Sequence, residues 1–244
     1  GQMSSRRLEI LRAIVDEYVA TQEPVGSKSI ADHHGLGISP ATIRNEMAVL
    51  EDEGLITQPH TSAGRIPTDL GYRVFVDKLA TVKQLSTAER RAIETFLQGS
   101  NDLEELLKRS AKLLADITKQ VAVVTYPIIG EGREKMAISG TANLARSGED
   151  LGLTLSPILE ALEEQVILLR LLDEVHSTVH VRIGSEQTEA NLQSTSLVTV
   201  GYGGDSSQLG AVGVLGPTRM DYAGSIAAVD AVARYVGRFI NEGQ

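Results

Sequence analysis

The first fifty residues show apolar positions at three- and four-residue steps, which is the spacing of one face of a helix. This pattern predicts a helix over residues 5–20 and a short second helix over residues 28–34. A third helix is predicted to begin at Ser39 and Pro40, because serine accepts a hydrogen bond from a free helical N–H and proline at the first position loses none. The N-terminal part of the chain is therefore expected to hold three consecutive helices.

The predicted third helix has two different faces. Ile43, Met47 and Leu50 fall on one side, which is expected to pack in a core. The opposite side carries small and hydrogen-bonding side chains, namely Ala41, Thr42, Arg44, Asn45 and Ala48. A guanidinium and an amide at the start of a helix can make bidentate contacts with base edges in the major groove. The pattern therefore favours DNA binding over a three-helix domain that serves only as a scaffold.

The segment after the third helix predicts a β-hairpin. Gly54 suits a left-handed position beyond the helix end, and residues 55–57 indicate a short strand that leads into a loop over residues 58–67. Ser62 and its small neighbours would let the backbone approach a phosphate or the minor groove, and Arg65 supplies one cation. Three helices followed by such a hairpin predict a winged helix-turn-helix.

The remainder of the chain mixes helical and strand patterns. Apolar stripes predict a long helix from about residue 103 to 121, another over residues 156–172, and a last one over residues 226–240. The first of these helices would form a dimer contact or pack on its own domain, and the pattern alone does not separate the two. Runs of β-branched residues predict strands at residues 121–125, 179–183, 197–200 and 211–215. Together these elements predict an α+β domain.

The charge of the chain limits how it would bind DNA. The 23 Lys and Arg against 32 Asp and Glu give a net charge of -9, which argues against a general nucleic-acid coat protein. Residues 1–80 hold eight basic and eleven acidic side chains, so the few cations must be focused on one face. Dimerisation would multiply the weak affinity of a single half-site.

Several classes of chemistry are disfavoured by the residues present. With no cysteine the chain has no disulfide, thiolate nucleophile or zinc-finger ligand, and it has no apolar run near membrane-spanning length. The glycines around Tyr202 lack the lysine of a phosphate-binding loop and are expected to form a turn. His176 and His180 are expected to flank a strand, too far apart to chelate a metal easily. We therefore predict a cytoplasmic protein that is not an enzyme and needs no cofactor or metal.

Several stretches together resemble the heat-inducible transcription repressor family, HrcA. They are residues 25–28, 39–47, 50–56, 61–68 and 71–73 in the N-terminal part, and residues 182–186, 196–198 and 213–222 in the C-terminal part. The resemblance implies an α+β multidomain fold: a winged helix-turn-helix over residues 1–80, a helical linker over 81–120, and a GAF-like domain over 121–244. It also implies a remnant of an inserted dimerisation domain at about 136–175, because family members are longer between residues 127 and 137.

The resemblance also implies a function. Such a repressor binds an inverted-repeat DNA operator of chaperone genes as a homodimer, leaves it on heat stress, and has the GroE chaperonin as a co-regulator. The residues expected to contact DNA are Lys28, Ser39, Ala41, Thr42, Arg44, Asn45, Ser62 and Arg65.

The alternative hypothesis is a ligand-sensing winged-helix regulator that binds a small molecule in its GAF-like domain. Arg219, Asp221 and Tyr222 would then line a ligand pocket, or else form a structural bracket.

Overall fold

The computed structural model describes residues 3–59, 63–80, 85–128, 133–147, 151–164, 172, 177–203 and 208–242. It divides into two compact units, Gly1–Val82 and Lys83–Gln244, called unit 1 and unit 2 below. Within the described ranges, no helix combines the length and the apolar character that crossing a bilayer requires.

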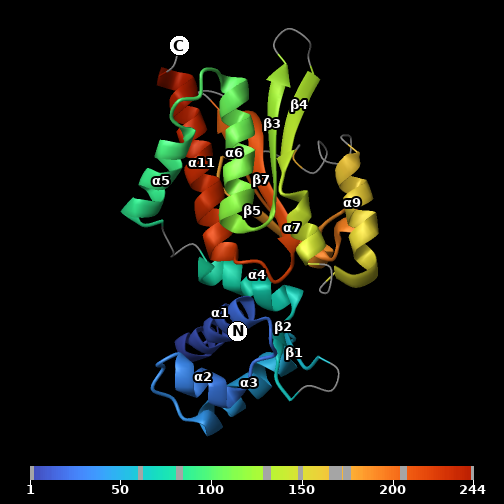
Figure 1. Ribbon diagram of the computed structural model, residues 1–244. Helices are drawn as coiled ribbons and strands as arrows, with labels where there is room; N and C mark the ends of the chain where they lie inside the picture. Colours follow the sequence, from blue (N-terminus) through green and yellow to red (C-terminus); the bar gives the residue numbers. More distant parts are fainter. Residues whose placement is uncertain are drawn as a thin grey trace. The chain divides into compact units, whose positions relative to one another are not determined.

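Unit 1 contains the three predicted helices, a small hairpin and one further helix (Figure 1). In chain order these are α1 (Ser5–Thr21), α2 (Ser27–His33), α3 (Pro40–Asp52), β1 (Ile56–Thr57), β2 (Ile66–Pro67) and α4 (Asp69–Lys78). β1 and β2 pair in antiparallel fashion, with Ile56 opposite Pro67. Side chains from all four helices are fully or almost fully buried, including Ile14, Ile30, Leu50 and Phe75. The sequence pattern did not predict α4.

Local hydrogen bonds fix the ends of these helices. The Ser39 side chain accepts a hydrogen bond from the backbone N–H of Thr42 at 3.2 Å, so the predicted cap of α3 is confirmed. Gly54 follows α3 with a φ of 76°, the left-handed conformation expected there. Thr68 caps α4 and donates a hydrogen bond to the carbonyl of Gly54 at 2.6 Å. Thr68 thus joins the end of α3 to the start of α4.

Unit 2 is built on a five-stranded antiparallel sheet with the order β4-β3-β7-β6-β5. The strands are β3 (Val121–Ile128), β4 (Arg133–Ser139), β5 (His180–Ile183), β6 (Thr195–Gly203) and β7 (Gln208–Pro217). The four predicted strands lie within or overlap β3, β5, β6 and β7. Gly201, Tyr202 and Gly203 belong to β6, so the turn predicted there is wrong within the described residues: Tyr202 is buried and donates a hydrogen bond to the Thr125 carbonyl.

Helices cover both faces of this sheet. On one face lie α6 (Leu103–Thr118) and α11 (Tyr222–Glu242), with α5 (Thr87–Leu97) packed against both (Figure 1). The Tyr222 hydroxyl hydrogen-bonds Ser196 on this face at 2.8 Å. On the other face, alternate residues such as Val123 and Leu197 pack against α7 (Thr141–Arg146) and α9 (Leu155–Glu163). The predicted α+β class of this part of the chain is confirmed.

Two predicted boundaries in unit 2 differ from the structure. Residues 81–120 were expected to form a linker, but α5 and α6 belong to unit 2 and α6 packs on its sheet. The reason is the apolar stripe of α6, whose Leu106, Leu107 and Leu114 are fully buried. The helix expected over residues 156–172 is shorter than predicted: α9 begins at Leu155 and ends at Glu163, and Glu164 is extended.

A single methyl group should disrupt the contact between α4 and the turn after α3. A Cβ added to Gly71 would lie 2.0 Å from the backbone oxygen of Leu55, an atom that already accepts a hydrogen bond from Thr68. We expect Gly71→Ala to destabilise unit 1 by about 2 kcal/mol in urea unfolding. Gly26→Ala is the control, because its added Cβ meets nothing within 4 Å. Equal unfolding midpoints for the two variants would contradict this packing.

Candidate nucleic-acid interface

The exposed face of α3 is the one that the sequence predicted. Ile43, Met47 and Leu50 are buried, while Arg44 and Asn45 are exposed on the opposite side. Ala41 and Ala48 are also exposed, and the half-buried Thr42 accepts a hydrogen bond from the Ser39 hydroxyl at 3.0 Å. The start of the helix therefore presents a small polar surface with one guanidinium and one amide.

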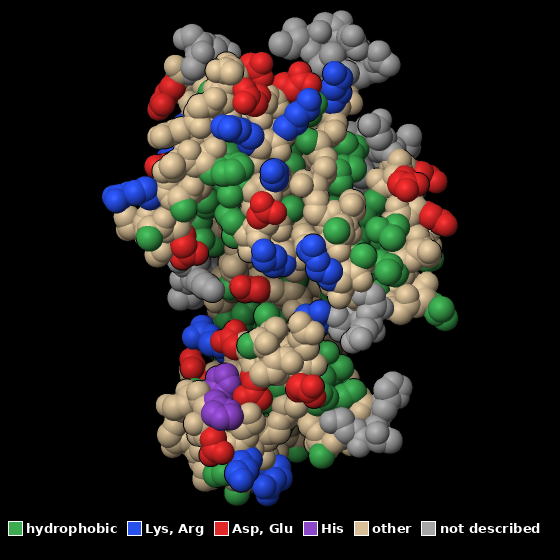
Figure 2. Space-filling view, viewed as in Figure 1, with side chains coloured by type: hydrophobic (Ala, Val, Ile, Leu, Met, Phe, Trp, Pro, Cys, Tyr) green, Lys and Arg blue, Asp and Glu red, His purple; other side chains and the backbone are tan. Residues whose placement is uncertain are grey.

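Two exposed cations lie on α2 and α3. Lys28 is exposed in the first turn of α2, and among the described residues neither Lys28 nor Arg44 has an ion-pair partner. Figure 2 shows a group of Lys and Arg side chains over the region of α2 and α3. Unpaired cations at a helix start can neutralise DNA phosphates.

Carboxylates of α3 are paired from outside the helix. Glu46 accepts hydrogen bonds from Arg6 Nη2 at 3.2 Å and from Arg7 Nε at 2.9 Å, both on α1. The Arg7 guanidinium also lies 3.7 Å from Glu53. The hydrogen bond from Arg7 holds the pKa of Glu46 below its usual value, with Arg6 adding to this effect against the opposing effect of burial. These pairs fix α3 to α1 and reduce the negative charge near the proposed DNA surface.

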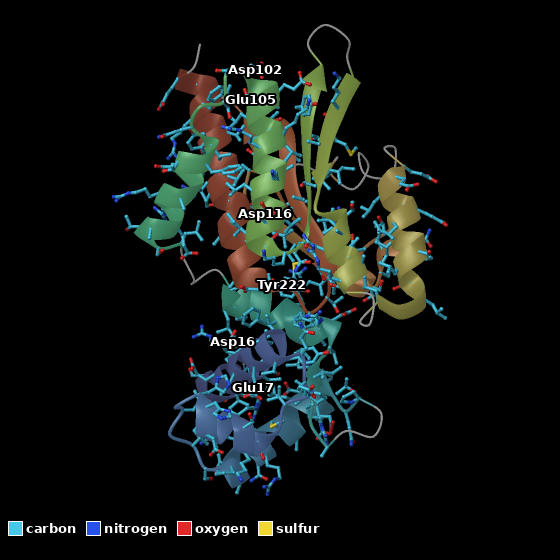
Figure 3. The ribbon with its side chains drawn as sticks, viewed as in Figure 1. Asp16, Glu17, Asp102, Glu105, Asp116 and Tyr222 are labelled. Carbon is cyan, nitrogen blue, oxygen red and sulfur yellow. The ribbon has the colours of Figure 1, made fainter. Side chains whose placement is uncertain are left out.

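A second carboxylate fixes α2 to α1. Glu17 on α1 accepts a hydrogen bond from the Ser29 hydroxyl at 2.7 Å, and its Oε1 lies 3.3 Å from His34 Nε2 (Figure 3). Ser29 belongs to α2 and His34 follows it directly. α1 therefore contacts α2 through Glu17 and α3 through Arg6 and Arg7, so the two helices of the helix-turn-helix share one support.

The hairpin side of unit 1 is fixed by Arg65. Its backbone exchanges two hydrogen bonds with Val25, at 2.8 and 2.9 Å, and its Nε lies 2.6 Å from Glu51 on α3. Its Nη1 donates to the carbonyls of Ala63 and Gly64. Ser62, the other residue of this loop expected to contact DNA, lies outside the described residues.

The remaining candidate residues lie in unit 2. Asp221 accepts a hydrogen bond from the N–H of Gly224 at 3.0 Å, and Tyr222, labelled in Figure 3, bonds both Ser196 and the Thr218 carbonyl. Arg219 is half-buried beside them. These hydrogen bonds tie the start of α11 to its own turn and to β6, and Asp221 also lines a small pocket with Glu89 of α5 and Ile117 of α6.

The structure describes only one of the two histidines that were considered as metal ligands. His180 begins β5 and is exposed, whereas His176 lies outside the described residues. In the ranges that the structure describes, no group of three or more His, Cys, Asp or Glu side chains is arranged to hold a metal ion.

The arrangement of unit 1 defines a class of protein. Three helices, of which the third exposes a polar face, followed by a two-stranded hairpin, form a winged helix-turn-helix DNA-binding domain. Comparison with known families agrees: residues 2–80 match the model described as "Winged helix-turn-helix transcription repressor, HrcA DNA-binding", and residues 129–226 match "HrcA protein C terminal domain". The chain belongs to the HrcA family of transcription repressors.

Individual relatives support this assignment. The heat-inducible transcription repressor HrcA of a Nocardioides species is 43% identical over 333 residues, covering 98% of this chain and 99% of the relative. That of Streptomyces avermitilis is 42% identical over 336 residues, covering 98% and 99%. Both aligned spans exceed the 244 residues of this chain, so these relatives carry additional residues. A solved structure described as a hypothetical protein shares the fold, with a TM-score of 0.84, 23% identity and complete coverage of both chains.

The ion pairs that fix α3 were not predicted from the sequence. Arg7 and Glu46 are 39 residues apart, and Glu51 and Arg65 are on different elements. Hydrophobic periodicity gives the buried face of each helix but does not give which charged side chains meet. The sequence holds one indirect signal for these pairs: carboxylates on a helix that binds DNA are expected to be neutralised by cations of the protein.

Acid should weaken unit 1 through Glu46. Because the pKa of this carboxyl is lowered in the folded state, its stabilisation is present above the usual value near 4.5 and is lost as the pH falls through the folded value. We expect Glu46→Gln to lower the free energy of unfolding by about 1 kcal/mol at pH 7. The difference from wild type should shrink in urea titrations at pH 3. Glu23→Gln, at an exposed position, is the control; a similar loss in both variants at pH 7 would contradict the role of Glu46.

Proposed function

We propose that this repressor binds an inverted-repeat operator as a homodimer, with α3 of each copy in the major groove of one half-site. The observation that carries the proposal is the exposed start of α3, where Arg44 has no protein carboxylate as a partner among the described residues while Glu46 and Glu51 of the same helix are paired. A helix with this distribution presents its cation and its amide to DNA and turns its neutralised acids toward protein.

Each residue of this surface has a proposed role. Arg44 and Asn45 contact base edges, because their side chains can make paired hydrogen bonds with guanine and adenine. Ser39 and Thr42 contact phosphates or bases, and Ala41 allows close approach of the helix. Lys28 contacts the DNA backbone from α2. Ser62 contacts DNA from the hairpin loop. Contacts to phosphates position the domain, and those of Arg44 and Asn45 give the sequence preference.

Two copies are proposed because a single domain offers few cations. With a net charge of -9, the chain gains little affinity from non-specific attraction to phosphates. Two linked domains on two half-sites bind more tightly than either alone, because the second binding event is intramolecular. Loss of the dimer would therefore remove operator binding without any change in α3.

We further propose that heat releases this repressor from chaperone promoters in the cytoplasm and that the GroE chaperonin restores its active fold. The names of the relatives describe heat-inducible repressors, which supports the first part. A marginally stable dimer would provide the physical link, because its population falls steeply as temperature rises.

The ligand-sensing alternative finds no room on one face of the sheet. The sheet face opposite α6 and α11 is covered by an apolar cluster that includes Leu144, Ile158, Leu162 and Leu172. Leu172 approaches to 3.4 Å from the position that a Cβ on Gly213 would occupy. Because side chains fill this face, we assign no small molecule to it, and we propose neither a cofactor nor an enzymatic reaction.

Replacing Arg44 tests the base-reading role. We expect Arg44→Ala to cost roughly 1–3 kcal/mol of binding to the operator and much less on random duplex, because the lost contact is to a base. Arg91→Ala is the control, since Arg91 is exposed on α5 of unit 2 and its loss changes the net charge equally. Fluorescence anisotropy measures the affinity of Arg44→Ala and of Arg91→Ala for each of the two duplexes. An equal loss on operator and random DNA would exclude base reading by Arg44.

Temperature tests the proposed regulation. We expect operator affinity measured by anisotropy to fall when the protein is moved from growth temperature to heat-shock temperature, because the active dimer is depleted. Adding GroE with ATP after return to growth temperature should raise the fraction of active protein. Affinity that is constant through the heat-shock range would contradict release by heat.

A further inference from the structure

Arg65 was expected to reach DNA, but the structure gives its guanidinium another set of partners. Nε lies 2.6 Å from Glu51 Oε2, and Nη1 donates to the carbonyl of Ala63 at 3.0 Å and to that of Gly64 at 3.2 Å. Only about a quarter of the Arg65 side chain is exposed. Most of the hydrogen-bonding capacity of this arginine is therefore used inside the protein.

The partners of Arg65 belong to three separate parts of unit 1. Its backbone pairs with Val25, which precedes α2, and the next residue, Ile66, begins β2 beside β1. Its side chain bonds Glu51 in the last turns of α3. The preceding Gly64 lies so close to Pro24 that an added Cβ would be 2.7 Å from the Pro24 carbonyl carbon. A single residue thus connects the turn before α2, the hairpin and α3.

The charge of Arg65 is largely offset where it stands. A carboxylate at 2.6 Å neutralises the guanidinium, and a DNA phosphate brought to this point would also approach the negative Glu51. Binding a phosphate here would release few counterions, since the site has almost no net charge to exchange. Lys28 and Arg44 differ, because neither has an ion-pair partner among the described residues.

We propose that Arg65 is a positioning residue, which sets the angle of the hairpin against α3 through Glu51 and does not itself neutralise a DNA phosphate. This inference rests on the proposed function, in which α3 reads the operator. The hairpin then reaches the DNA flank through its backbone and small side chains, at an angle that depends on the Arg65–Glu51 pair. Breaking the pair would loosen the hairpin contact while leaving the buried face of α3 in place.

Exchanging the charges of Arg65 and Glu51 distinguishes a positioning role of Arg65 from direct contact with DNA. We expect Arg65→Glu to weaken operator binding by about ten-fold or more, because two carboxylates then repel each other across the pair. Glu51→Arg combined with Arg65→Glu should recover affinity to within about three-fold of wild type, since the ion pair is rebuilt in reverse. A double variant as weak as Arg65→Glu alone would overturn the proposal. Thermal unfolding of all variants is measured in parallel, and Arg65→Gln, which keeps a donor for the two carbonyls, replaces any variant that does not fold.

The salt dependence of binding supplies a readout that is independent of stability. For Arg65→Gln we expect the slope of log K against log salt concentration to equal that of wild type, whereas Lys28→Gln should reduce it by about one unit, as loss of a phosphate contact does. A reduction of about one unit in Arg65→Gln would overturn the proposal. Hydroxyl-radical footprints should show that Arg65→Gln loses protection only at the flank of each half-site. If wild type shows no preference for the operator, the proposed function is wrong. If wild type and Arg44→Ala behave as expected but the charge exchange does not restore binding, only the proposed role of Arg65 is wrong.

Discussion

Where α3 begins, and which of its sides faces the core, determines what unit 1 can do. Ser39 and Pro40 fix the first turn, because the serine side chain satisfies the N–H of Thr42 and proline needs no partner there. The burial of Ile43 and Leu50 fixes the rotation of the helix about its axis. Arg44 must then point to solvent, since it follows Ile43 by one residue, or about 100° around the helix.

The distribution of ion pairs explains how an acidic chain presents a surface to DNA. Glu46 and Glu51 lie on α3 itself, yet Arg7 and Arg65 bind them from neighbouring elements. These arginines reduce the negative potential of the helix and hold it in place at the same time. Lys28 and Arg44 have no ion-pair partner among the described residues, and these are the cations that we propose to contact DNA. Net charge is therefore a poor guide here, because the local pairing decides which charges DNA would meet.

The sequence predicted those features that depend on local order. Helices α1 to α3, strands β3 and β7 and helix α11 follow from periodicity, β-branched runs and caps. Helix α4 was missed because Gly71 lowers helix propensity. The glycine is needed there because the backbone of Leu55 approaches it closely, and this tertiary contact cannot be read from the local sequence. Strand β4 is an edge strand with charged residues such as Glu134 and Lys135, which give a weak strand signal. The partners of Arg65 could not be predicted, because they come from segments that only the fold brings together.

We propose that the exposed side of α3, presented by two copies of this chain, reads DNA sequence. The most direct test is to measure the affinity of wild-type protein for a duplex carrying the inverted repeat and for a scrambled duplex of equal length and composition, at about 0.15 M salt. We expect a preference for the inverted repeat of about 1,000-fold or more. Equal affinity for the two duplexes would contradict it.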